Sequence, residues 1–150
     1  MKTPRFLRNI LLFIVGTTWL FSSCTKGYNP DASSNIPNVT VNLSANINSA
    51  GYTGLKTVGG QAYATGGYRG IVLYRLNAST IMAFDRTCSY DLSDANGIVQ
   101  AQTNGTAICL ECSSEYNLAN GNVVVGPSTI GLKAYNCTFY PSTGAFIVNN

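Results

Sequence analysis

Five cysteines and no histidine define the side-chain chemistry that this 150-residue chain can offer. Four of the cysteines, Cys88, Cys109, Cys112 and Cys137, lie within one stretch of the sequence. A thiolate can bind a metal, attack an electrophile or join a disulfide. Without imidazole there is no Ser-His or Cys-His nucleophile pair and no His-ligated zinc site. Most hydrolase mechanisms are excluded, and we expect the functional chemistry to come from the thiols.

The spacing of these cysteines leaves several uses open. In an oxidising compartment an even number of cysteines is typical of disulfides, and four cysteines allow three pairings. The pair Cys109-x-x-Cys112 also fits a thiol oxidoreductase, but such sites lie at a helix N-terminus and no helical pattern follows Cys112. Cys137 alternates with Tyr135 and Phe139, which predicts a buried free thiol unless it pairs with Cys112.

The elements that must position the cysteines have the pattern of strands. Beyond Pro37, short apolar or alternating runs are separated by Gly, Asn, Ser and Pro, and no stretch has a sustained helical period. The chain length, with 45% hydrophobic residues, suits one compact domain. The sequence therefore predicts an all-β domain with small sheets and long connections. The expected strands are 39–43, 62–64, 70–74, 80–85, 98–101, 107–109, 115–117, 132–139 and 145–148.

The order of segments around the cysteines resembles that of a known family. The segments, in chain order, are a strand leading to Cys88-x-Tyr90, a loop Cys109-x-x-Cys112-x-Ser114-x-Tyr116, a glycine turn at 120–123, the pair Gly126-Pro127 and the run Leu132-x-x-Tyr135. They resemble a Rieske domain, whose two loops read Cys-x-His and Cys-x-x-His-Gly-Ser-x-Phe. The match covers residues 70–148, and 18 residues separate Tyr90 from Cys109, close to the family's spacing.

The resemblance implies a small β-sandwich with an inserted subdomain of the kind that binds a 2Fe-2S cluster. Cys88 and Cys109 fall on the two thiolates of one iron, and Tyr90 and Cys112 fall on the two histidines of the other. It also implies that Ser114 and Tyr116 support the second loop and that Gly126 and Pro127 pack near the site. A thiolate and a phenolate in place of two imidazoles would lower the reduction potential of such a cluster.

Two functional expectations follow from the resemblance. With a cluster ligated by Cys88, Tyr90, Cys109 and Cys112, the domain would transfer one electron to a redox partner docked over Tyr90 and Cys112. Without one, Cys88 and Cys109 would be near enough to form a disulfide, stabilising the domain by roughly 3 kcal/mol. The second expectation is favoured, because an exported site without histidine favours the oxidised pair. In that case the domain binds a protein partner or gives structural support, with no catalytic activity of its own.

The N-terminal segment is typical of an exported lipoprotein. A basic start is followed by an apolar run of about 12 residues, the length of a signal h-region. Ser22-Ser23-Cys24 then resembles the lipobox of bacterial lipoproteins, although Phe21 stands where an aliphatic residue is usual. We therefore expect a signal peptide at 1–23, a lipidated tether at 24–38 and the Rieske-like domain at 39–150. Because Thr25 follows Cys24 where inner-membrane retention commonly uses Asp, the resemblance favours the outer membrane, facing the periplasm or the surface.

The charged residues exclude one class of partner. From Cys24 onward the chain has six basic and six acidic residues, with no cluster of Lys and Arg. A nucleic-acid partner is therefore excluded. Five carboxylates flank the two cysteine loops, and we interpret them as surface charges: Asp85, Asp91, Asp94, Glu111 and Glu115.

Overall fold

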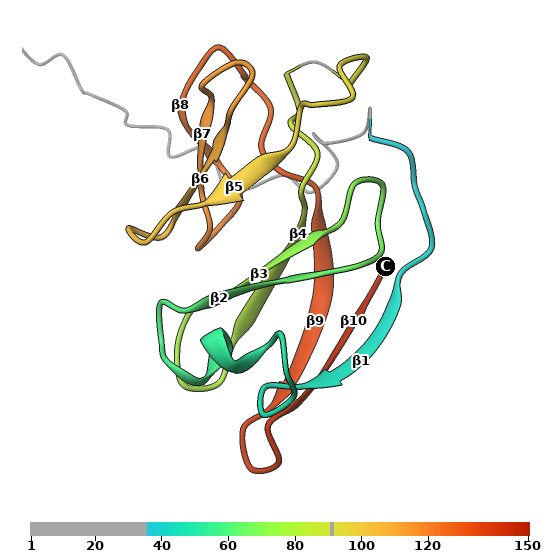
Figure 1. The fold of residues 1–150 in the computed structure, drawn as a ribbon, viewed down its shortest axis with the longest axis vertical. Coiled ribbons are helices and arrows are strands. Elements are labelled where there is room, and N and C mark those ends of the chain that lie inside the picture. The colour runs from blue at the N-terminus through green and yellow to red at the C-terminus, as the bar shows by residue number, and fades with distance from the viewer. Residues whose placement is uncertain (1–35, 91) are drawn as a thin grey trace, which may run out of the picture.

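The computed structural model describes residues 36–90 and 92–150, and the proposed signal peptide and Cys24 lie outside them. Figure 1 shows two antiparallel sheets, one above the other in the view. Residues 36–38, within the stretch expected to be a tether, contact the domain. Ile36 is buried, and the Lys133 ammonium donates to the Pro37 carbonyl. Within the described residues, no helix is both long and apolar enough to cross a membrane.

The larger sheet has six strands in the order β1-β10-β9-β4-β3-β2. A single turn of 3-10 helix, η2 (Thr53–Lys56), precedes β2, and its Leu55 is buried in the core of this sheet. The β9–β10 hairpin pairs five residues of each strand. The strands are β1 (Asn42–Asn46), β2 (Gln61–Ala64), β3 (Ile71–Arg75), β4 (Ile81–Asp85), β9 (Ala134–Tyr140) and β10 (Ala145–Asn149).

The smaller sheet is inserted in the chain between β4 and β9, and its order is β5-β6-β7-β8. Its strands are β5 (Val99–Ala101), β6 (Thr106–Cys109), β7 (Glu115–Asn117) and β8 (Val123–Val125). The loop between β4 and β5 carries Cys88, and the turn between β6 and β7 carries Cys112. The all-β prediction is confirmed, and the inserted subdomain carries both cysteine loops, as the resemblance implies.

The neighbouring strands β3 and β4 bury both of their faces, and this joins the two sheets. Successive side chains of a strand point to opposite faces. Ile71 and Leu73 accordingly pack in the core of the large sheet, whereas Val72 between them packs in the core of the small sheet. On β4, Ala83 packs in the core of the large sheet and Phe84 packs in the core of the small sheet. Burying a side chain such as Phe84 contributes about 1.5–3 kcal/mol, so the inserted subdomain is anchored by the main sheet.

Two strand predictions differ from the structure. The expected first strand at 39–43 is instead β1 at Asn42–Asn46, because its partner β10 ends at Asn149, opposite Asn42. Val41 still lies in the core, and its backbone N–H donates to the Asn150 side chain. β8 was not expected, because this edge strand has no alternation. Val124 and Val125 are both exposed, and its pairing with β7 is irregular.

Candidate functional site

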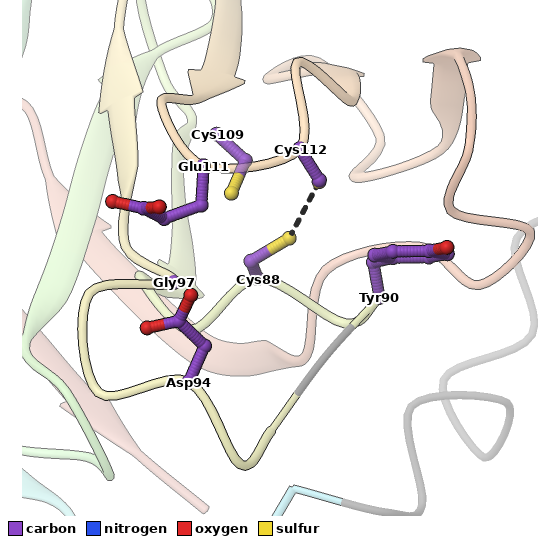
Figure 2. Close-up of a pocket in the computed structure, with 7 residues that line it drawn as sticks. All are labelled: Cys88, Tyr90, Asp94, Gly97, Cys109, Glu111 and Cys112. Carbon is purple, nitrogen blue, oxygen red and sulfur yellow. Dashed lines mark hydrogen bonds between the residues drawn. The ribbon is translucent and has the colours of Figure 1, made fainter.

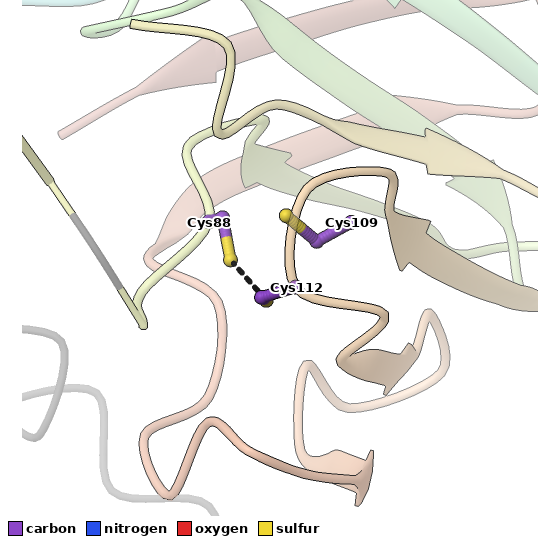
Figure 3. A group of neighbouring side chains, drawn as sticks. All are labelled: Cys88, Cys109 and Cys112. Atoms are coloured by element: carbon purple, nitrogen blue, oxygen red, sulfur yellow. Dashed lines mark hydrogen bonds between the residues drawn. The ribbon is translucent and has the colours of Figure 1, made fainter. Parts of the chain in front are cut away.

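Three cysteine thiols converge where the loop after β4 meets the turn between β6 and β7. The Sγ atoms of Cys88, Cys109 and Cys112 all lie within 4.8 Å of one another. Figure 3 shows the three side chains directed toward a common region between the two loops. Cys88 and Cys109 are each 1% exposed, and Cys112 is half-buried. All three are free thiols. They line a cavity of about 160 Å³ whose wall also includes Tyr90, Asp94, Gly97 and Glu111 (Figure 2).

The Cys88–Cys109 disulfide expected from the sequence is not formed. Instead Cys88 Sγ lies 3.4 Å from Cys112 Sγ, a contact rather than a covalent bond. The sequence comparison placed Cys112 on the other side of a cluster from Cys88. The structure brings these two sulfurs together because the second loop turns back tightly on itself.

That turn is closed by backbone hydrogen bonds on both sides of Cys112. The Ser113 N–H donates to the Cys109 carbonyl at 2.9 Å, and the Cys109 N–H donates to the Ser114 carbonyl at 2.9 Å. Ser113 has a φ of 58°, a left-handed conformation that non-glycine residues rarely adopt. In the Rieske loop pattern this position is glycine. The tight turn at Ser113 sets the course of the backbone on both sides of it, so that the Cys112 sulfur faces Cys88.

The hydrogen bonds at Cys112 favour its thiolate. Burial alone would raise the pKa of Cys112, but the Ser114 hydroxyl and backbone N–H, together with the Cys88 and Cys109 thiols, outweigh it and hold the pKa below its ordinary value. The Cys112 sulfur and the Ser114 oxygen are 3.1 Å apart. At Cys109, burial is the largest influence and raises the pKa to about 12. The pocket therefore holds one thiol inclined to ionise beside one that stays protonated.

Tyr116 and Tyr90 have opposite placements relative to the thiols. Tyr116 is fully buried, and its hydroxyl lies 3.4 Å from Cys88 Sγ. Burial and the contact with Cys88 raise the pKa of Tyr116 to about 12, so it remains a neutral hydrogen-bonding group. Tyr90 is 55% exposed, and in Figure 2 its hydroxyl points away from the three cysteines. The tyrosine that contacts the site is the one expected to support it, not the one expected to be a ligand.

A third segment, from Gly126-Pro127 to Gly131, ties the two loops together. The Ser128 N–H donates to the Ser114 hydroxyl oxygen at 2.9 Å. The Ser89 hydroxyl lies 2.9 Å from the carbonyl oxygens of both Ile130 and Gly131. Gly126 and Pro127, joined by a cis peptide bond, open this segment. The positions that the resemblance placed near the site therefore adjoin residues that hydrogen-bond to each cysteine loop.

Arg69 fixes the part of the first loop that forms the cavity wall, a role that the local sequence does not indicate. Its guanidinium donates to the carbonyls of Leu92, Asp94 and Gly97, at 2.8, 2.5 and 3.2 Å. Three bonds from one planar group hold the loop near Asp94 and Gly97. Arg69 lies between glycines in a turn, so the sequence alone shows only a surface arginine.

Asp85 is not a surface charge, and the interpretation made from the sequence is wrong for this residue. It is fully buried at the end of β4 and accepts hydrogen bonds from the Tyr135 hydroxyl at 2.6 Å and the Tyr68 N–H at 2.6 Å. The Thr87 N–H donates to it at 2.9 Å, and so does the Thr87 hydroxyl. Burial and the bond to Asp85 raise the pKa of Tyr135. A carboxylate with this many donors fixes the chain just before Cys88.

The donor set does not fit the two-iron cluster that the resemblance implies. Such a cluster needs two ligands on each iron, and donors on different irons stand further apart than donors of one ion. Here Cys112 approaches Cys88 to 3.4 Å, and Tyr90, the other expected ligand of the second iron, points away. The three thiols surround a single point.

Solved structures that are similar to this chain include two bacterial proteins. The ferredoxin of carbazole 1,9a-dioxygenase from Nocardioides aromaticivorans IC177 is 13% identical over 74% of this chain and 97% of its own, with a TM-score of 0.48. A protein assigned as the small subunit of an NADH-dependent nitrite reductase from Mycobacterium tuberculosis is 14% identical over 75% of this chain and 97% of its own, with a TM-score of 0.43. No protein-family model and no curated protein matches the sequence. The fold itself is all-β, and the inserted smaller sheet carries the two cysteine loops.

Proposed function

We propose that this chain is an exported, membrane-anchored domain that performs thiol–disulfide exchange at its three-cysteine pocket. The observation that carries the proposal is the 3.4 Å contact between Cys112 Sγ, which is half-buried on the pocket wall, and Cys88 Sγ, which is buried behind it. Exchange requires one thiol that an outside disulfide can reach and a second that can attack the first. Cys112 takes the first role and Cys88 the second.

The reaction moves two electrons from the domain to a partner disulfide. The Cys112 thiolate attacks one sulfur of the partner, forming a mixed disulfide and releasing the other partner sulfur as a thiolate. Cys88 then loses its proton and attacks the Cys112 sulfur, which forms the Cys88–Cys112 disulfide and releases the second partner thiolate. The partner disulfide is the oxidant, and the reverse reaction with a dithiol restores the reduced site.

The anchoring part of the proposal is supported by the sequence alone. Cys24 follows the small residues of a lipobox-like motif, and diacylglyceryl modification of its sulfur would hold the domain at a membrane, with the outer membrane favoured. An exported site faces an oxidising compartment, in which disulfide partners are abundant. The partner is then an exported protein or a small molecule that carries a disulfide.

The first experiment follows the thiols of the full chain, reduced and purified in detergent, on addition of oxidised glutathione. We expect two thiols to be lost and peptide mapping to join Cys88 to Cys112. Cys112→Ala should not react, Cys88→Ala should stop at the glutathione adduct of Cys112, and Cys137→Ala should react like the unaltered chain. If the pocket thiols do not react, the exchange proposal is refuted, and a binding or structural role takes its place. Two irons per chain with visible absorption bands, after purification without air, would restore one-electron transfer through a cluster.

A second experiment tests the anchor independently of the pocket. Labelled fatty acid should be incorporated into the full chain and should partition with the membrane fraction. Cys24→Ala should incorporate no label and should leave the membrane. Membrane association that persists unchanged in Cys24→Ala would refute lipid anchoring through this residue.

A further inference from the structure

We propose that the reduced pocket also binds one thiophilic metal ion of the zinc class through Cys88, Cys109 and Cys112. The metal site requires Cys109, which the exchange reaction does not use, so the two proposals can be tested separately. The three side chains come from two loops and the end of one strand, yet their sulfurs all lie within 4.8 Å of one another. Three thiols held this close can act together as the ligands of one zinc ion.

The distances match one ion. With a Zn–S bond of about 2.3 Å, a tetrahedral site places its sulfurs about 3.8 Å apart. The pocket brackets that value, since Cys88 and Cys112 are separated by 3.4 Å and no pair exceeds 4.8 Å. Shifts of up to about 1 Å would bring the three sulfurs to the spacing of such a site. The half-buried Cys112 is the most free of the three to make that shift.

The chemistry of the donors selects the ion. Thiolates favour zinc and monovalent copper over the hard cations that prefer oxygen ligands. The fourth position faces the cavity, whose wall carries the carboxylates of Asp94 and Glu111 (Figure 2). Water would complete the site, because neither carboxylate belongs to the group of donor atoms that lie within 4.8 Å of one another. Three protein ligands with one open position are typical of zinc sites that react rather than only stabilise the fold.

The surrounding hydrogen bonds are those expected of residues that orient metal ligands. The Tyr116 hydroxyl contacts Cys88 Sγ at 3.4 Å, and the Ser114 hydroxyl contacts Cys112 Sγ at 3.1 Å. Ser114 is itself held by the Ser128 N–H. Such outer partners fix the direction of a ligand's lone pairs before the ion arrives. A disulfide between Cys88 and Cys112 removes two of the three donors, so the ion and the disulfide exclude each other.

The test titrates Zn²⁺ alone into the full chain, purified in detergent, reduced and stripped with a chelator. We expect one ion per chain by mass spectrometry, with protons released on binding as the thiols ionise. Cys109→Ala should weaken binding by more than about 100-fold, above the range seen when only an outer hydrogen-bond partner of a ligand is removed. Cys137→Ala, outside the pocket, should bind one ion with unchanged affinity. Binding should vanish after oxidation by glutathione.

Several outcomes would overturn the site. They are absence of zinc binding by the reduced chain, unchanged affinity in Cys109→Ala, or loss of the ion in Cys137→Ala. If Cys109→Ala does not fold, Cys112→Ser at the half-buried position replaces it, with the same expected loss. Because no disulfide is present in this titration, its failure leaves the exchange proposal standing. Equally, a chain that binds zinc but does not react with glutathione refutes only the exchange.

Discussion

Oxidation of the reduced domain should stabilise it by closing a specific loop. Cys88 and Cys112 are 24 positions apart and their sulfurs are 3.4 Å apart, so a bond between them needs only a small approach of the two side chains. Cross-linking a loop of this length removes conformational entropy from the unfolded chain, which on the chain-entropy account amounts to roughly 3.5 kcal/mol. For a domain of this size each kilocalorie raises the melting temperature by about 4 °C. Oxidation should therefore raise it by roughly 10 to 15 °C.

The measurement compares thermal melts of the reduced chain and of the chain oxidised with glutathione, followed by circular dichroism. Cys112→Ala should melt at the same temperature under both conditions, because its Cys88 has lost its partner. Cys137→Ala serves as the matched control and should keep the full shift, since this thiol lies on β9 outside the pocket.

Peptide mapping of the oxidised chain decides between the two pairings. A Cys88–Cys109 bond closes a loop of similar length and would give a similar melting shift, so the shift alone does not distinguish them. A mapped Cys88–Cys109 bond would contradict the Cys88–Cys112 pairing on which the exchange reaction rests. A melting temperature that falls on oxidation would refute the reasoning, because it would show that the 3.4 Å contact cannot close without straining the loops.

Three further outcomes are expected. At neutral pH iodoacetamide should modify Cys112 far faster than Cys137, because burial raises the pKa of Cys137 to about 11. Equal rates of modification by mass spectrometry would contradict the assignment of Cys112 as the accessible thiol. Ser114→Ala removes a hydrogen bond that lowers the pKa of Cys112. The midpoint of the pH profile for alkylation of Cys112 should therefore move to higher pH. An unmoved midpoint would show that Ser114 does not favour the thiolate. Asp85→Asn replaces the carboxylate that accepts hydrogen bonds from the Tyr135 hydroxyl and its neighbours. The free energy of unfolding, measured with urea, should fall by roughly 3 kcal/mol. A change near zero would mean that the carboxylate is not needed for stability.

Much of the fold follows from local patterns. Alternating or apolar runs bounded by turn residues place β3, β4, β9 and β10 within about two residues of their observed ends, because each of these strands buries alternate residues in the core of the large sheet. β8 gives no such signal, since an edge strand with two exposed valines does not need to alternate. A hydrophobic pattern in the sequence reports which residues are buried, and β8 has few buried residues.

The sequence predicted which loops form the site but not how their side chains lie relative to one another. The order of segments pointed to Cys88, Cys109, Cys112, Ser114 and Tyr116, which do meet at one place. Spacing could not show that the turn at Ser113 would bring Cys112 onto Cys88 and leave the Tyr90 hydroxyl facing away. The roles of Arg69 and Asp85 depend on residues more than ten positions away, and a single sequence carries no record of such contacts.

Hydrogen bonds from residues outside the thiol group hold the two cysteine loops. Arg69 holds the first loop, Ser128 holds the second through Ser114, and Asp85 fixes the chain that enters the first, all without using a cysteine sulfur. The two loops are therefore held in place without a disulfide or a bound ion. Thiols held in place by polypeptide contacts are free to exchange disulfides or to take up a different ion, because neither event is required to maintain the loops.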